Sequence, residues 1–407
     1  MITIYTIAEK ANISAATVSR VFSNFKYVKP EIRKKVLSIA KQLNYTPNLQ
    51  ARSLRSHKTH IIGLLVPDIS NPTYPIAIKG VYDLARENNY HISIGNTYND
   101  PDEEIALLEM FKSIRVDGLI IMSQEYTESN KFNRIISEMI KNGVVCIFSG
   151  RENTGIKADQ VMIDSKKGAY IATEYLIKTG CKKIAYLGGI KGIFGEEERY
   201  NGYKQALKDY NVHPDLSLVK HGNFNKESGY KMMSELLDLL SLRQKGVSGN
   251  QEVTTKQSRT KSHSEQSDLS QSLACPCGSI LKESAGSFKK NFGEESFVTV
   301  KVREQSLPDA VFCVNDLTAL GAMKAIEEKG LKIPDDISII GFDDIPEASL
   351  VKPSLTTVSQ PQYEIGKKCM KRLLERINGK KDEPVQTILF EPELIIRQTT
   401  KEIQACL

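Results

Sequence analysis

The chain has 407 residues, which is too long for one small hydrophobic core, so its length predicts two or three domains. Hydrophobic residues make up 40% of the sequence, which supports globular folding, and the formal net charge is +6. The charge is uneven, because residues 1–60 hold 11 of the 55 Lys and Arg residues but only 2 of the 49 Asp and Glu residues. A basic N-terminal part on a near-neutral body indicates a polyanionic partner for that part alone.

The sequence also gives an expectation about the compartment. It has no secretory apolar region at its start and no apolar stretch long enough to span a bilayer. Its 7 cysteines are an odd number, which favours a reducing environment. We therefore expect a cytoplasmic protein without a membrane partner.

Two short helices with a tight turn between them are predicted within Ile4 to Asn24. Apolar residues recur there at helical spacing, Asn12 tolerates the left-handed backbone that the turn needs, and Ser14 is placed to cap the second helix. Such a helix-turn-helix can lay its second helix in the DNA major groove. Small helix pairs are also common in bundles, so the spacing alone leaves that alternative open.

A third helix is predicted from Pro30, with an apolar stripe on one side and basic residues on the other. The segment NLQARSLRS (48–56) follows it and is too polar to fold alone. It is either a linker that forms a helix on binding or an ordinary flexible linker.

From residue 60 onward, apolar strand-like segments alternate with amphipathic helical segments. Strands are expected at 61–66, 91–95, 117–122, 144–148, 160–163, 183–187, 310–314, 337–342 and 388–396. Helices are expected near 75–89, 103–114, 130–142, 165–179, 199–211, 226–240, 316–330 and 361–378. This alternation predicts an α/β fold of doubly wound parallel sheets, and the number of strands predicts two lobes.

Residues 241–306 break the alternation. Of these 66 residues 13 are Ser, and only FVTVKV (297–302) resembles a strand. We interpret this segment as an insertion that is mostly disordered or a surface excursion. Its Cys275 and Cys277 have no second cysteine pair, which favours two free thiols over a metal site. We expect no metal and no other cofactor.

Polar residues follow several predicted strands at their carboxyl ends, where open α/β sheets bind ligands. Asp164, Asn315 and Asp343 come at or directly after strands, and Arg199 follows a glycine-containing loop. Each of these residues alone has an ordinary alternative as a helix cap, a turn residue or a surface charge. Together they offer carboxylates, an amide and a guanidinium around one cleft, which suits a polyhydroxylated ligand or a purine.

The detailed sequence resembles the lactose-repressor (LacI/GalR) family of bacterial transcription regulators. The resemblance begins with TIAEKANISAATVSRVFSN and VKPEIRKKVLSIAKQLNYTPN and continues through NPTY, VDGLII, IDSKKG, VNDLTALGAM and ISIIGFDD. It implies a helix-turn-helix head, a hinge, and two periplasmic-binding-protein-like lobes that enclose a small effector. The implied divisions are a head at 1–46, a hinge at 47–58, an N-terminal lobe at 59–162 and 360–390, and a C-terminal lobe at 163–359 and 391–407.

The resemblance also implies the residues that contact operator DNA. The hinge would become helical only on DNA, where Leu54 wedges into the minor groove. Arg20 is expected to read a guanine, whereas Ala15 and Ala16 can touch only a thymine methyl group. The expected DNA-binding residues are Thr3, Tyr5, Ala15, Ala16, Thr17, Ser19, Arg20, Asn24, Asn48 and Leu54.

For the effector, the resemblance implies residues from both lobes. They are Tyr74, Asp164, Arg199, Phe224, Asn315, Asp343 and Gln360. Phe224 is expected to stack on the face of a sugar ring, with a core position as its alternative.

The sequence therefore predicts a ligand-controlled transcription regulator, expected to be a repressor, that binds a palindromic double-stranded operator as a homodimer. The effector is expected to be a sugar, a sugar derivative such as a sugar phosphate, or a purine, and the resemblance leaves a phosphorylated protein partner open as an alternative. Two alternatives are a sugar-active enzyme and a cytoplasmic solute-binding protein on the same scaffold. The chain lacks a G-x-x-x-x-G-K-[ST] loop and a G-x-S-x-G elbow, so we expect no catalytic residues and no enzyme.

Overall fold

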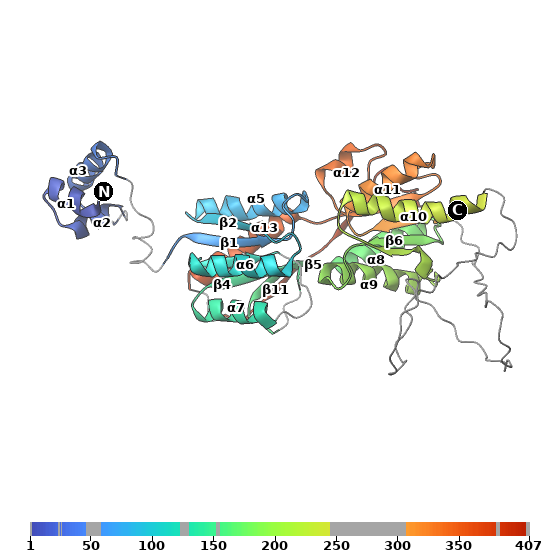
Figure 1. The fold of residues 1–407 in the computed structure, drawn as a ribbon, viewed down its shortest axis with the longest axis horizontal. Helices are drawn as coiled ribbons and strands as arrows, with labels where there is room; N and C mark the ends of the chain where they lie inside the picture. Colours follow the sequence, from blue (N-terminus) through green and yellow to red (C-terminus); the bar gives the residue numbers. More distant parts are fainter. Residues whose placement is uncertain are drawn as a thin grey trace, which may run out of the picture. The chain divides into compact units, whose positions relative to one another are not determined.

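The computed structural model describes residues 2–22, 25, 27–45, 58–122, 130–151, 155–244, 307–379 and 383–403. The chain divides into two compact units, Met1–Leu237 with Pro308–Leu407, and Asp238–Leu307. The first unit contains the helical head and both sheets, which Figure 1 shows. Of the predicted insertion only 241–244 are described, as the end of a helix, so its Cys275, its Cys277 and its predicted strand lie outside the described residues.

The N-terminal head consists of the helices α1 (Ile4–Ala11), α2 (Ala15–Phe22) and α3 (Pro30–Gln42). Their apolar sides meet in one small core, to which each helix contributes. This core is made of Ile7, Ala8, Ala11, Val18, Val21, Val36 and Ala40. The three-helix head predicted from the apolar spacing is confirmed.

The turn between α1 and α2 depends on two side chains. Asn12 has φ 53° and ψ 51°, in the left-handed region, and its N–H donates to the carbonyl of Glu9 (3.1 Å). The hydroxyl oxygen of Ser14 accepts a hydrogen bond from the N–H of Thr17 (3.2 Å), which satisfies an amide at the start of α2. Both predictions about this turn are confirmed.

The first sheet has six strands in the order β11-β5-β4-β3-β1-β2, and all its neighbouring strands run parallel. The strands are β1 (Ile61–Val66), β2 (His91–Asn96), β3 (Gly118–Ile121), β4 (Val145–Ser149), β5 (Asp159–Ile163) and β11 (Thr387–Phe390). The helices that pack on it are α5 (Thr73–Glu87), α6 (Pro101–Ser113), α7 (Asn130–Lys141) and α13 (Gln362–Ile377).

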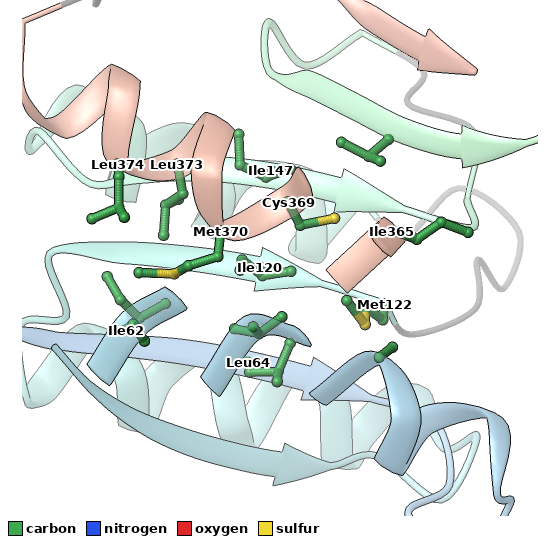
Figure 2. Close-up of a cluster of buried hydrophobic side chains, with 14 of the residues drawn as sticks. Ile62, Leu64, Ile120, Met122, Ile147, Ile365, Cys369, Met370, Leu373 and Leu374 are labelled. Carbon is green, nitrogen blue, oxygen red and sulfur yellow. The ribbon is translucent and has the colours of Figure 1, made fainter. Parts of the chain in front are cut away.

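Successive side chains of each strand enter opposite cores. Ile120 of β3 lies in the core beneath α5 and α13, whereas Leu119 and Ile121 lie in the core beneath α6 and α7. Figure 2 shows the first of these cores, to which α13 contributes Met370 and β1 contributes Leu64. Both faces of the sheet are therefore buried, as expected for a parallel sheet.

The second sheet has the order β12-β10-β9-β8-β6-β7 and is parallel except for the antiparallel pair β10 and β12. Its strands are β6 (Ile184–Gly188), β7 (Val219–His221), β8 (Ala310–Cys313), β9 (Ser338–Asp343), β10 (Thr356–Ser359) and β12 (Glu393–Ile395). Its helices are α8 (Ser165–Lys178), α9 (Phe194–Asp209), α10 (Lys226–Gln244), α11 (Asp316–Glu328), α12 (Pro346–Leu350) and the short 3-10 helix η1 (Leu216–Leu218). The predicted α/β class with two doubly wound sheets is confirmed.

Three details of the prediction are wrong. The run 388–396 is two strands, because β11 pairs with β5 in the first sheet while β12 pairs with β10 in the second. Pro392 lies between them and cannot donate a hydrogen bond to a ladder. The strands β7 and β10 were not predicted, since both are short and rich in polar residues. Arg199 does not open its helix, because α9 begins at Phe194.

A buried ion cluster joins α13 to the edge of the first sheet. Asp159 of β5 is 2% exposed and accepts hydrogen bonds from Nε of Arg372 (2.8 Å) and Nε of Arg376 (2.8 Å). It also accepts the N–H of Gln386 (2.7 Å), just before β11. Burial alone would raise the pKa of Asp159, but the hydrogen bonds from Arg376, Gln386 and Arg372 lower it below its usual value.

Asp159→Asn is expected to lower the free energy of unfolding by about 3–5 kcal/mol at pH 7, because two buried guanidinium groups lose a shared carboxylate, although Arg372 keeps Glu375 (3.0 Å) and Glu383 (3.2 Å). Urea unfolding of the whole protein measures this. Since folding lowers the pKa of Asp159, its contribution is present above the carboxyl's usual pKa and is lost as the pH falls through the folded value. The free energies of unfolding of the wild type and the variant should therefore converge only at acidic pH.

The matched control is Glu391→Gln, which removes a surface ion pair with Lys167 (2.6 Å) in which the Glu391 side chain is 67% exposed. The free energy of unfolding of this variant should be close to that of the wild type. An equal effect of both substitutions would contradict the role given to the buried cluster.

Asn12→Ala is expected to destabilise the head by about 1–2 kcal/mol, because a left-handed backbone is unfavourable for alanine. Asn12→Gly should be tolerated, since glycine adopts this conformation readily. Hydrogen exchange at the amides of α2 in the whole protein localises the effect to the head. Equal exchange rates in the two variants would show that the turn does not depend on its backbone angle.

Candidate functional site

The outer side of α2 carries the residues that the sequence predicts to read DNA. Val18 and Val21 lie in the core of the head, and Ala15 and Phe22 at the two ends of the helix are partly buried against it. Exposed or half-buried on this side are Ala15, Ala16, Thr17, Ser19 and Arg20. Thr3 and Tyr5 at the start of α1 are also exposed. Three further predicted contacts, Asn24, Asn48 and Leu54, lie outside the described residues.

The side chain of Arg20 is accompanied by an aromatic ring. Its guanidinium carbon lies 5.9 Å from the centroid of the Phe25 ring. The N–H of Phe25 donates to the carbonyl of Arg20 (3.0 Å), and Nη2 of Arg33 donates to the carbonyl of Phe25 (2.9 Å). Phe25 is 48% exposed although its backbone is held on both sides. The ring thus limits the directions in which Arg20 can extend.

A cavity of about 410 Å³ is the second candidate site. It is lined at the carboxyl ends of strands from both sheets, by Pro67 after β1, Gly150 after β4 and Asp343 at the end of β9. Ligands of open α/β sheets bind at such ends. The lining includes six of the predicted effector residues, which are Tyr74, Arg199, Phe224, Asn315, Asp343 and Gln360.

Asp343 is the most constrained of these residues. Its side chain accepts hydrogen bonds from the hydroxyl of Thr73 (3.1 Å) and from the amide of Gln360. Its φ of 119° is strained for any residue other than glycine. Burial raises the pKa of Asp343, and the nearby positive charge of Arg199 partly opposes this rise. Strain and burial at one acid are typical of a site shaped for binding.

Arg199 lies against Asp343 in the same wall. Its Nη2 is 3.5 Å from Oδ1 of Asp343, and its guanidinium carbon lies 4.0 Å from the centroid of the Phe342 ring. Nη1 donates to the carbonyl of Val314. Its Nε is buried and has no hydrogen-bond partner among the residues that the structure describes. A buried donor without an acceptor is costly, so this nitrogen suits a ligand oxygen or a bound water.

Phe224 and Asn315 are joined to each other. The side-chain amide of Asn315 donates to the carbonyl of Phe224 (3.0 Å), and its oxygen accepts the N–H of Thr318 at the start of α11. The Phe224 ring lies so close to Gly189 that a Cβ there would be 2.4 Å from it. Phe224 lines the cavity. The sequence had left open whether this residue lies in the cavity wall or in the core.

Asp164 is a predicted effector residue that does not line the cavity. Its carboxylate caps α8 by accepting the N–H of Lys167 (2.8 Å). The cavity is lined by its neighbours Ile163 and Ser165 and not by Asp164 itself. Its effector contact stays a prediction.

Sequence reasoning did not single out several polar residues of the lining. They are Tyr98, Asn99, Ser149, Ser165, Glu196, Asn223, Asn225 and Gln362. Asn99 and Ser149 lie at or after strand ends, so a systematic search of strand ends would have found them, as it found Asp68, Asn71 and Thr73 after β1. Nothing marks Glu196, because an acid in the first turn of a helix is ordinary.

No helix among the described residues is long and apolar enough to cross a membrane. In the same parts of the chain, no group of three or more His, Cys, Asp and Glu side chains is placed to hold a metal ion.

Family descriptions match both parts of the chain. Residues 3–48 match "Bacterial regulatory proteins, lacI family". Residues 62–253 match "Periplasmic binding protein domain", and residues 242–400 match "Periplasmic binding protein-like domain". The first match covers the head, and each of the other two covers strands of both sheets.

Curated relatives match over almost their whole length. The HTH-type transcriptional repressor PurR of Haemophilus influenzae is 32% identical over 406 residues, which are 99% of this chain and 100% of the relative. Catabolite control protein A of Staphylococcus epidermidis is 30% identical over 388 residues, which are 95% of this chain and 96% of the relative.

Solved structures share the fold. The lac repressor dimer bound to operator and the anti-inducer ONPF has a TM-score of 0.73 at 21% identity, covering 98% of this chain and 99% of that chain. A LacI family transcriptional regulator from Enterococcus faecium with bound ribose has a TM-score of 0.61 at 25% identity, covering 84% of this chain and 98% of that chain. With its helix-turn-helix head and periplasmic-binding-protein-like core, the chain belongs to the LacI family of bacterial transcriptional regulators.

Proposed function

We propose that this protein represses transcription by binding a palindromic operator as a homodimer, and that an uncharged, polyhydroxylated small molecule such as a sugar controls this binding. The observation that carries the proposal is the exposed face of α2 on a head that is the basic part of the chain. The name of the PurR relative is that of a repressor, and the lac repressor was solved as a dimer on its operator. Such a protein would act in the cytoplasm, where the DNA is.

The chemistry of α2 suggests how sequence is read. Arg20 can donate two hydrogen bonds to a guanine, whereas Ala15 and Ala16 can contact only thymine methyl groups. One head therefore makes few specific contacts. Two heads on a palindrome double them, which is why we propose a dimer.

The chemistry of the cavity supports a sugar as effector. Its lining is rich in side-chain amides and hydroxyls, which suit the many hydroxyl groups of a sugar, and Phe224 offers a ring face for the C–H groups. The pair Arg199 and Asp343 supplies a donor and an acceptor side by side. Two solved structures with a similar fold are complexes with a sugar, one with ribose and the other with cellobiose. A purine is the second candidate, because its flat ring also suits Phe224.

Control of DNA binding would pass through the contact between the lobes. The helix α5 packs on the first sheet and begins at Thr73. The hydroxyl of Thr73 donates to Asp343 at the end of β9 in the second sheet. An effector that binds Asp343 competes with or reinforces this contact and so changes the angle between the lobes. That change would order or release the hinge at 47–58, which makes the coupling reciprocal between effector and DNA.

An enzyme and a solute-binding protein are the competing functions. We expect no turnover of sugars or nucleotides by the purified protein. Removal of residues 1–58 should abolish DNA binding and preserve effector binding. A truncated chain that binds DNA as well as the full chain would refute the role of the head.

Arg20→Ala is expected to weaken binding to a selected palindrome by about 1–3 kcal/mol, roughly five- to 150-fold, and to relax the preference at one base pair of each half-site. Binding selection on a random DNA library followed by gel-shift titration measures both effects. The wild-type affinity should fall steeply with salt concentration, because the head neutralises phosphates.

The matched control is Arg134→Ala, which removes the same charge from an exposed position of α7. It should leave DNA affinity unchanged. A normal affinity and base preference of Arg20→Ala would contradict the proposed reading of DNA.

Asp343→Asn is expected to weaken effector binding by about 1.5–3 kcal/mol, because a charged acceptor is lost from the cavity. Calorimetric titration of the effector measures it. Asp344→Asn is the matched control, since Asp344 also has a positive φ but pairs with Arg397 (2.6 Å) and does not line the cavity. Equal losses in both variants would argue against a direct contact by Asp343.

A further inference from the structure

Glu196 is a buried carboxylate in the wall of the effector cavity. It is 1% exposed and lies in the first turn of α9, one helical turn before Arg199. Its Oε2 accepts hydrogen bonds from the hydroxyl of Tyr186 (3.0 Å) and the N–H of Gly189 (3.0 Å). Its Oε1 lies 3.1 Å from Nδ1 of His221. The protein therefore already occupies both carboxylate oxygens.

The position of this carboxylate is fixed by its surroundings. A Cβ on Gly188 would lie 2.4 Å from Oε1 of Glu196, so the backbone at the end of β6 approaches it as closely as only glycine allows. Tyr186 is fully buried and packs against the ring of Tyr203, with 5.2 Å between the ring centroids. A side chain held in this way cannot turn its charge away from an incoming ligand.

The imidazole that contacts Glu196 lies outside the cavity. His221 is not among the lining residues of the effector cavity and instead lines a separate hollow with Lys191 and Tyr200. A ligand in the effector cavity would thus meet the carboxylate of Glu196 rather than the imidazole behind it.

The remaining charges of the lining do not offset this carboxylate. They are Asp68, Arg199 and Asp343, and the only guanidinium among them already pairs with Asp343 (3.5 Å). No lysine is among the described residues that line the cavity. Carboxylates therefore outnumber cations among the described residues of this wall.

We propose that Glu196 sets the charge class of the effector: it admits an uncharged sugar and excludes the phosphate ester of the same sugar. This inference rests on the proposed function, because it concerns the same cavity. A phosphate ester carries nearly two negative charges at neutral pH, and like charges repel strongly at the reduced dielectric constant of a buried site. We expect the exclusion to amount to about tenfold or more in affinity.

The test compares paired ligands on the full-length protein. Glucose and ribose are titrated calorimetrically beside glucose 6-phosphate and ribose 5-phosphate, with the wild type and with Glu196→Gln. Glutamine keeps the shape and can still accept from Tyr186 and Gly189, so the affinity for a neutral sugar should stay within about threefold. The affinity for its ester should rise about tenfold.

Glu197→Gln is the matched control. Glu197 is the next residue, is exposed, and accepts the N–H of Gly192 (3.3 Å), but it does not line the effector cavity. It removes the same formal charge from the same helix turn. Its preference for sugar over ester should equal that of the wild type, and an equal gain in ester affinity would overturn the proposal.

His221→Gln separates charge from packing. It removes the partner of Glu196 and keeps the carboxylate, so rejection of the ester should persist or increase. Admission of the ester by this variant would overturn the proposal, and this arm decides the matter if thermal melting shows that Glu196→Gln does not fold.

Failure of the proposed function gives a different result. If the wild type binds neither sugar, the effector class is wrong, and adenosine with adenosine monophosphate replaces the sugar pairs in the same comparison. An ester or nucleotide affinity that Glu196→Gln leaves unchanged overturns the charge rule, whichever neutral ligand binds.

Discussion

The carboxylate of Asp343 is the interaction on which the ligand-binding half of the molecule depends. It receives a hydroxyl from α5, an amide from the segment after β10 and a guanidinium from α9. These three elements come from distant parts of the sequence, and a single side chain brings their polar groups to one point. Burial raises the pKa of this acid, and its backbone has an unfavourable φ. Packing alone does not explain a buried acid with an unfavourable backbone angle, whereas a role in binding does.

Local physics made much of the fold predictable from the sequence. Asn12 and Ser14 specify the helix-turn-helix through a left-handed backbone and a cap, which both act within a few residues. The apolar runs of β1 and β9 are buried on both sides, so they indicate parallel strands whatever their neighbours are. The search for polar residues at strand ends led to Asn315 and Asp343, which both line the cavity, while their contact with an effector stays a prediction.

The remaining features depend on contacts that the sequence does not display. The run 388–396 is continuous in composition, yet its two halves belong to different sheets. Asp164 has the spacing of a ligand residue but its carboxylate caps α8. Glu196 and His221 are 25 positions apart and form a pair only because β6 and β7 are neighbours. No periodicity encodes such a pairing.

The chain order of the strands also has a consequence for biosynthesis. The helix α13 and the strand β11 complete the first lobe, although they follow β10 of the second sheet in the sequence. On the ribosome, β1 to β5 emerge early, while the helix that covers Ile62, Leu64 and Ile120 is still untranslated. Translation from β5 to the end of α13 takes roughly 10–40 s at ordinary elongation rates. During this interval α5 alone packs on this sheet face, and the apolar surface that α13 later buries is open, so we expect the N-terminal lobe to be the part of this regulator that requires chaperones.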